Sequence, residues 1–156
     1  MIKVGFSKSN SLIGAIIRWF TKSKVNHTFL VFTLGGVEWV LEASWFGVYI
    51  IPWEKYRQTA NVTRIFELQN TQLEDMNILR FIGSNYDYSG LAGMAWVMLG
   101  RALKRVWRNP WQTSKAYFCS EMVARILKKS RFPGAENLDP RSTSPEDLLV
   151  LLESRQ

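Results

Sequence analysis

The sequence predicts an α+β fold in which an antiparallel sheet packs against helices. Strand-like runs fill the first half, and two of them are joined by Gly35-Gly36, a dipeptide that supplies the positive φ angles of a tight hairpin turn. Apolar residues at helical spacing dominate the second half, and a helix start with strong capping signals lies at Ser144. No repeat or low-complexity tract interrupts this order.

Length and composition predict one folded domain spanning residues 1–156. The chain has 156 residues, 47% of them hydrophobic, with seven tryptophans, which argues against disorder. Its one cysteine excludes an internal disulfide and any multi-cysteine metal site, and we expect neither a metal nor a cofactor. No signal-peptide pattern and no apolar stretch of the ~18 residues that a membrane span needs is present, so the expected location is the cytoplasm.

The first half predicts five strands and a helix. Strands are expected over residues 2–6, 28–34, 37–43, 48–51 and 62–68, and an amphipathic helix over residues 9–22. In that helix, Leu12, Ile16 and Phe20 would face inward. The charged stretch PWEKYRQT, at residues 52–59, separates the last two strands.

The second half predicts four helices. A capping-box pattern opens one at Thr71 that runs to about Ile82, a second is expected over residues 91–107 and a third over residues 119–129. The last helix begins with Ser144 as N-cap and Pro145 at its first position, followed by acids that suit the helix dipole.

The hairpin register brings His27, the only histidine, close to Glu42. A turn centred between Gly35 and Gly36 pairs residues whose numbers sum to 71, so His27 and Glu42 share one face on a diagonal, roughly 5–8 Å apart at Cβ. Glu42 lies in an apolar run, where a carboxylate is costly unless a partner such as histidine compensates it. The alternative is a carboxylate that faces water.

Cys119 lies at the start of the helix predicted over residues 119–129. Backbone N–H groups and the helix dipole stabilise a thiolate there, and the N–H groups, that of Ser120 included, suit a developing oxyanion. Together, Cys119, His27 and Glu42 supply a nucleophile, a base and a group that orients the base. The alternative for a lone cysteine is a small buried core residue.

Five segments in one order give the chain a resemblance to the permuted papain-fold cysteine hydrolases of the YiiX-like group, relatives of the NlpC-type peptidases and of lecithin retinol acyltransferase. They are NHTFLVF at 26–32, VLEASWFGV at 40–48, Tyr86-Asp87, YFCSEMV at 117–123 and STSPEDL at 142–148. The resemblance covers almost the whole chain. Met122 departs from the leucine more common after CSE, a conservative change.

The resemblance implies a permuted papain-like fold and acyl-enzyme chemistry. Cys119 would attack, His27 would act as base, and Glu42 would fix the imidazole tautomer. Tyr117 and Tyr86-Asp87 are candidates for lining the site, with simple packing as their alternative.

A tryptophan-rich basic segment runs from Leu91 to Trp111. Its apolar half followed by a basic, aromatic half suits peripheral contact with a membrane interface or a lid over an acyl pocket, and a core helix with a solvated basic end is the alternative. Nucleic acid is a less favoured partner for the net charge of +7, because no recognised nucleic-acid motif accompanies it. Oligomeric state is not predicted.

The expected function is therefore a cysteine hydrolase that cleaves an amide or peptide bond. Two alternatives stay open: a lipid acyltransferase or deacylase at a membrane surface, and a non-catalytic basic module that binds a membrane or nucleic acid. The reactivity of the Cys119 thiol distinguishes the two enzymes from the binding module. An activated thiolate reacts with iodoacetamide at a pH well below ~8.5, the pKa of an ordinary thiol.

Overall fold

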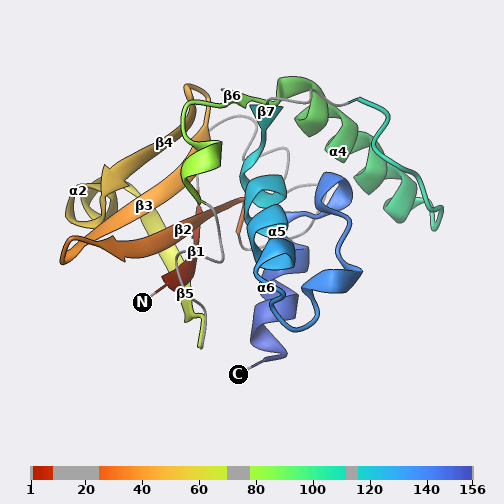
Figure 1. The fold of residues 1–156 in the computed structure, drawn as a ribbon. Helices are drawn as coiled ribbons and strands as arrows, with labels where there is room; N and C mark the ends of the chain where they lie inside the picture. The colour runs from red at the N-terminus through yellow and green to blue at the C-terminus, as the bar shows by residue number, and fades with distance from the viewer. Residues whose placement is uncertain (1, 9–24, 70–77, 112–115, 156) are drawn as a thin grey trace.

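A five-stranded antiparallel sheet forms one half of the molecule (Figure 1). The computed structural model describes residues 2–8, 25–69, 78–111 and 116–155. The strand order is β4-β3-β2-β1-β5. The strands are β1 (Ile2–Lys8), β2 (His27–Leu34), β3 (Val37–Ser44), β4 (Gly47–Pro52) and β5 (Asn61–Glu67). All five predicted strands are confirmed, most with one or two added residues.

Helices supply the other half. Within the described ranges they are α2 (Trp53–Thr59), α4 (Tyr88–Ala102), α5 (Cys119–Lys129) and α6 (Pro145–Glu153). Short 3-10 turns are η1 (Ile78–Phe81), η2 (Ala135–Asn137) and η3 (Pro140–Ser142), and β6 (Asn85–Tyr86) pairs in parallel with β7 (Ala116–Tyr117). The α+β prediction is confirmed. The helix predicted over residues 9–22 and most of the one predicted from Thr71 lie outside the described residues.

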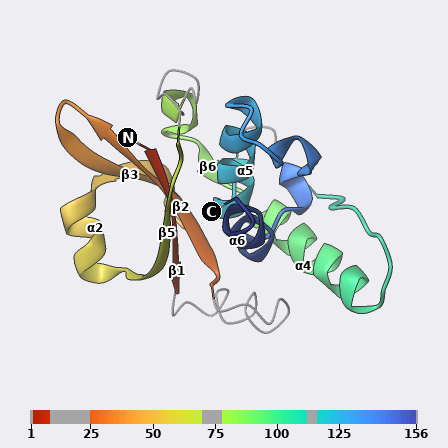
Figure 2. The ribbon, with the colours of Figure 1, turned by 90° about the horizontal axis from the view of Figure 1, so that it is seen from below.

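The sheet lies between two helical layers (Figure 2). On one side α2 covers a small cluster built around Phe29, Val31, Val40 and Tyr56. On the other side α5 and α6 pack against the sheet, and the main core lies between them. Alternate residues of β2 and β3 therefore enter different cores, because successive side chains of a strand point to opposite faces.

The hairpin register agrees with the prediction. The pairs Leu30 with Leu41 and Val31 with Val40 both sum to 71. Gly35 and Gly36 have φ angles of 61° and 77°, the left-handed values that a tight turn requires. The helices α5 and α6 begin where the sequence predicts, and Ser144 forms a capping box with Asp147.

Two predictions about helices were wrong. Residues 53–59, treated as a charged connection, form α2, whose Tyr56 is buried against the sheet. The helix predicted over residues 91–107 begins earlier, at Tyr88, and ends at Ala102. Among the described residues no helix is both long and apolar enough to span a membrane.

A left-handed residue ends α4 early. Lys104 has a φ of 56°, and the bonds Lys104 N–H to Arg101 and Arg105 N–H to Gly100, at 3.0 and 2.8 Å, complete a Schellman motif. Glycine usually takes this position, so the sequence carries no stop signal there. The chain then returns along its own helix.

Two glycines of α4 provide the surface on which the returning residues 103–111 pack. Trp107 lies against Gly100 and stacks on Trp96, with ring centroids 4.2 Å apart. Asn109 lies against Gly93 and donates to the Gly90 carbonyl at 2.8 Å. We call residues 103–111 the return segment. The return segment takes the place of the last turns of the predicted helix, because these contacts pack Trp107 and hydrogen-bond Asn109.

Candidate active site

Cys119 is the first residue of α5 and is 4% exposed. Phe118 precedes it in an extended conformation and offers no side-chain cap, so the first turn of the helix keeps N–H groups for other acceptors. The apolar face of α5 packs on β2 through residues such as Met122, Val123 and Ile126. This packing fixes the sulfur near the start of β2.

His27 is the first residue of β2, and its Nε2 lies 3.0 Å from Oε2 of Glu42. The hydrogen bond expected from the hairpin register is therefore present. His27 follows the alternation of Phe29, on which its ring stacks at a centroid distance of 6.4 Å. Because His27 is at the end of its strand, its ring reaches the N-terminal end of α5 at the end of the sheet.

The imidazole interacts with both Cys119 and Glu42. Burial by itself lowers the pKa of His27, but the charge of Cys119 and hydrogen bonds to Cys119 and Glu42 outweigh it and raise the pKa to about 10. Since Nε2 is engaged by Glu42, Nδ1 is the ring nitrogen left for the sulfur. A protonated ring donates to both neighbours at once.

The pKa of the Cys119 thiol is shifted in the opposite direction, downward. Burial raises its pKa, yet the charge and hydrogen bond of His27 and the backbone groups of Thr28 and Ser120 hold the pKa below the ordinary value. Each group thus favours the charged form of the other, which is the electrostatic requirement of a thiolate–imidazolium pair. A buried ion pair of this kind persists only where further hydrogen bonds satisfy both charges.

Those further bonds converge on Glu42, through residues that sequence reasoning missed. Tyr49, paired with Glu42 across β3 and β4, donates its hydroxyl to Oε1 and accepts from Ser44 at 3.3 Å. Tyr56 of α2 also hydrogen-bonds the carboxylate, which with His27 keeps the pKa of Glu42 below its usual value despite burial. The register of the β3–β4 hairpin would have placed Tyr49 opposite Glu42. The turn between these strands lacks an asparagine-glycine signal, so the sequence did not predict that register.

Aromatic side chains cluster around Tyr86, which interacts electrostatically with Cys119. Burial and then the charge of Cys119 raise the pKa of Tyr86, which places this predicted site residue close to the sulfur. Trp45 stacks on Tyr86 at 6.4 Å between centroids, and Tyr88 donates to the Trp45 carbonyl at 2.8 Å. Phe46, at the tip of the same turn, is 94% exposed. Trp45 belongs to the VLEASWFGV segment, but the sequence alone does not bring it or Tyr88 next to Tyr86.

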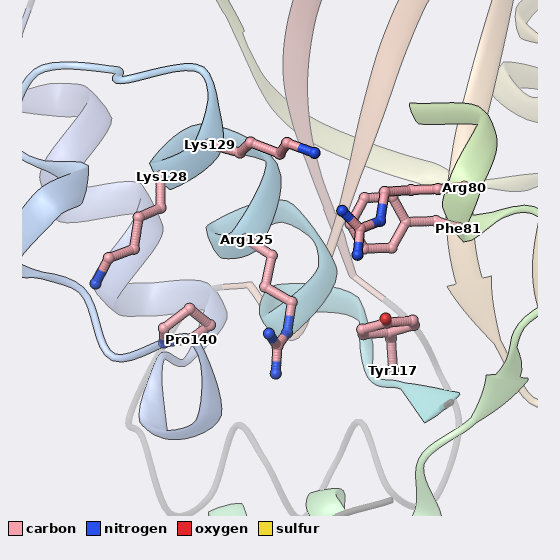
Figure 3. Close-up of a pocket in the computed structure, with 7 residues that line it drawn as sticks. All are labelled: Arg80, Phe81, Tyr117, Arg125, Lys128, Lys129 and Pro140. Atoms are coloured by element: carbon pink, nitrogen blue, oxygen red, sulfur yellow. The ribbon is translucent and has the colours of Figure 1, made fainter. Parts of the chain in front are cut away.

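The other predicted lining residues have different surroundings. Tyr117 packs its ring edge-on against Phe81, 5.0 Å between centroids, and lines a separate basic pocket (Figure 3). Asp87 caps α4 by accepting from Gly90 N–H at 2.7 Å. The Ser120 hydroxyl donates to the Thr143 carbonyl at 2.8 Å, so only its backbone N–H is directed at the sulfur.

The arrangement can generate a nucleophile and move a proton to or from a group that reaches the sulfur. Within the ranges described, no three His, Cys, Asp or Glu side chains are grouped to hold a metal ion. Comparison of the chain with protein-family models and with curated proteins found no match to either. Its chemistry is therefore inferred from its own side chains.

Proposed function

We propose that this protein is a cysteine hydrolase with a permuted papain-like fold that cleaves an amide or peptide bond through an acyl-enzyme on Cys119. The observation that carries the proposal is His27, which hydrogen-bonds Glu42 at 3.0 Å and interacts with Cys119 through its other side. A sulfur beside an imidazole that is itself hydrogen-bonded to a carboxylate supplies a nucleophile with an oriented base.

In the first half-reaction the Cys119 thiolate attacks the carbonyl carbon and forms a tetrahedral oxyanion. Collapse breaks the C–N bond, and the His27 imidazolium gives its proton to the departing amine. The Ser120 N–H, at the start of α5, is positioned to shift from the sulfur to the oxyanion. The products are a thioester on Cys119 and a free amine.

In the second half-reaction His27, now neutral, takes a proton from water, and the hydroxide attacks the thioester. The C–S bond breaks, the acid leaves, and the thiolate–imidazolium pair is restored. Glu42 stabilises the imidazolium and fixes the ring, while Tyr49 and Tyr56 hold the carboxylate in place. Tyr86, which interacts with Cys119, and Trp45, which stacks on it, would contact the group next to the scissile bond.

The chain order of the three groups supports the permuted assignment. His27 and Glu42 come from neighbouring strands in the first half, and Cys119 opens a helix in the second half. The resemblance to the YiiX-like hydrolases rests on the same order. This order, together with the contacts of His27, supports the assignment of the three roles.

Intact-mass spectrometry tests the proposal directly. The protein would be incubated with peptides, muropeptides and phospholipids, and we expect a mass increase equal to one acyl fragment, localised to Cys119 and removed by hydroxylamine. Cys119→Ala should give neither adduct nor turnover. Full turnover by Cys119→Ala on any substrate that the wild type cleaves would refute the proposal.

A second candidate, a lipid acyltransferase or deacylase, is favoured by the end of α4. Leu103 is 57% exposed and Val106 is 97% exposed, next to Lys104 and Arg105. Apolar side chains flanked by cations suit the interface of an anionic bilayer. The acyl group on Cys119 would then come from a lipid and pass to water or another acceptor.

Flotation with anionic vesicles tests this candidate. Lys104→Glu/Arg105→Glu should lose flotation, whereas Lys55→Glu/Arg57→Glu, the same charge change on α2, should keep it. Arg101 is left unchanged because it binds Asp147 at 2.9 Å and the Ser142 carbonyl at 3.0 Å, so that it ties α4 to the start of α6. Equal flotation of both variants would remove the membrane interpretation.

A further inference from the structure

A basic pocket lies between α5 and η1, on the outer side of the helix that carries Cys119 (Figure 3). Its volume is about 250 Å³. The residues that line it are Arg80, Phe81, Tyr117, Arg125, Lys128, Lys129 and Pro140. Four of these seven are cations and none is an acid, which is an unusual concentration of one charge sign in a concave site.

Arg125 is held rigidly on the α5 wall. Its guanidinium donates twice to Oε1 of Glu121, at 3.0 and 2.8 Å, and that carboxylate is only 2% exposed. The guanidinium also lies over the Tyr117 ring, 5.6 Å from the centroid. A guanidinium fixed in this way loses little side-chain entropy when it binds an anion.

Arg80 occupies the opposite wall, where its side chain is exposed. Its guanidinium lies over the Phe81 ring at 5.5 Å, and Phe81 itself is buried. Figure 3 shows Lys129 extending toward Arg80, whereas Lys128 extends the other way, where its ammonium donates to the Leu138 carbonyl at 2.8 Å. Within the part of the chain that the structure describes, Arg125 alone among the four cations forms an ion pair.

We propose that this pocket binds a phosphate group. The guanidinium of Arg125, held by Glu121, and that of Arg80 on the facing wall can each donate in the bidentate geometry that phosphate oxygens accept, and Lys129 adds a point charge on the side of Arg80. Glu121 offsets the charge of Arg125 and Lys128 extends away, so Arg80 and Lys129 leave the pocket with an excess of positive charge that favours an anion. Its volume accommodates a phosphate together with part of the group that carries it.

The pocket is distinct from the thiol site and goes beyond the proposed hydrolase activity. None of Cys119, His27 and Glu42 lines the pocket, and Arg125 and Lys128, three residues apart on α5, lie on a face beside the core face of Met122 and Ile126. The bound phosphate belongs either to a soluble phosphate ester or to a lipid headgroup. The chemistry of recognition is the same for both.

Two probes distinguish these sources: inorganic pyrophosphate in titration calorimetry, and phosphatidylcholine vesicles that contain phosphatidic acid in flotation. The pocket variant is Arg80→Ala/Lys129→Ala, which leaves the buried Glu121–Arg125 pair intact. Its charge-matched control is Lys55→Ala/Arg57→Ala on α2, where Arg57 pairs only with the exposed Glu54. Thermal unfolding and iodoacetamide labelling of Cys119 verify that each variant is folded.

We expect the pocket variant to bind pyrophosphate about tenfold or more weakly than the wild type, and the control to bind it normally. A loss confined to the vesicle assay also supports the pocket and assigns the phosphate to a lipid headgroup. The proposal is overturned if the wild type binds neither probe, or if the pocket variant and the control bind both equally well. If the phosphate proposal fails, Cys119 labelling is unaffected, so this result is distinguishable from failure of the hydrolase proposal.

Discussion

The end of the sheet at His27 and the far end of α4 differ in which groups they bury and which they expose. Around Glu42, charged and hydroxyl groups are buried and bonded to one another. At the end of α4, apolar side chains such as Val106 face solvent among lysines and arginines. A buried charge is costly and an exposed apolar side chain gains nothing in isolation, so each departs from the usual pattern.

The comparison indicates where chemistry and where binding are located. Buried, mutually bonded ionisable groups shift one another's pKa values, which is what a nucleophile and its base require. Exposed apolar groups beside cations contribute free energy only when a partner surface covers them. Substitutions around Glu42 should therefore change the reactivity of the Cys119 thiol. Substitutions at the end of α4 should change stability or association with a partner.

The largest effect is expected at the imidazole. His27→Ala removes the charge and hydrogen bond that hold the Cys119 pKa down and leaves burial, which raises it, so the pKa should rise to the ordinary ~8.5 or above and alkylation by iodoacetamide at pH 6 should slow by about tenfold or more. Mass-spectrometric labelling rates measure this. Equal rates in the two proteins would make Cys119 a core residue and favour the non-catalytic binding module.

Overpacking the return segment should affect the second region alone. At Gly93 an added Cβ would overlap Asn109, so Gly93→Val should push that side chain off its carbonyl partners and lower the free energy of unfolding by about 1–3 kcal/mol. Ala92→Val introduces the same residue at an exposed neighbouring position and serves as control. Urea denaturation measures both. A large change in Cys119 alkylation would show that the regions are coupled.

Glu42 should contribute pH-dependent stability. Its pKa is lower in the folded protein than the ordinary 4.5, so the carboxylate stabilises the fold above that pH, and the contribution is lost as the pH falls through the lower folded value. Glu42→Gln should therefore cost about 1–2 kcal/mol at pH 7 and much less near pH 3. Denaturation midpoints at both pH values check this, and a pH-independent difference would contradict it.

The smallest effect is expected at Tyr49. Tyr49→Phe removes one hydroxyl that donates to Glu42 while Tyr56 and His27 remain, so the loss in stability should be about 1 kcal/mol or less. Alkylation of Cys119 should slow only a few-fold. A loss as large as that of His27→Ala would mean that Tyr49, rather than the imidazole, controls the thiol.

Local sequence determined the elements whose signals lie within a few residues. Gly35-Gly36 fixed the hairpin and its register, and through the register the meeting of His27 and Glu42. Ser144 and Pro145 fixed the start of α6, and the apolar spacing after Cys119 fixed α5. Turns, caps and periodicity involve neighbouring residues, so they are visible without the fold.

Tertiary structure decided what depends on residues far apart in the chain. Lys104 adopts a left-handed conformation that glycine usually takes, because the return segment packs back on Gly93 and Gly100. Tyr56 reaches Glu42 only because α2 lies on that face of the sheet. No local pattern encodes such contacts, since they depend on the packing of whole layers, and the packing of α5 on β2 is likewise what brings the sulfur of Cys119 to the ring of His27.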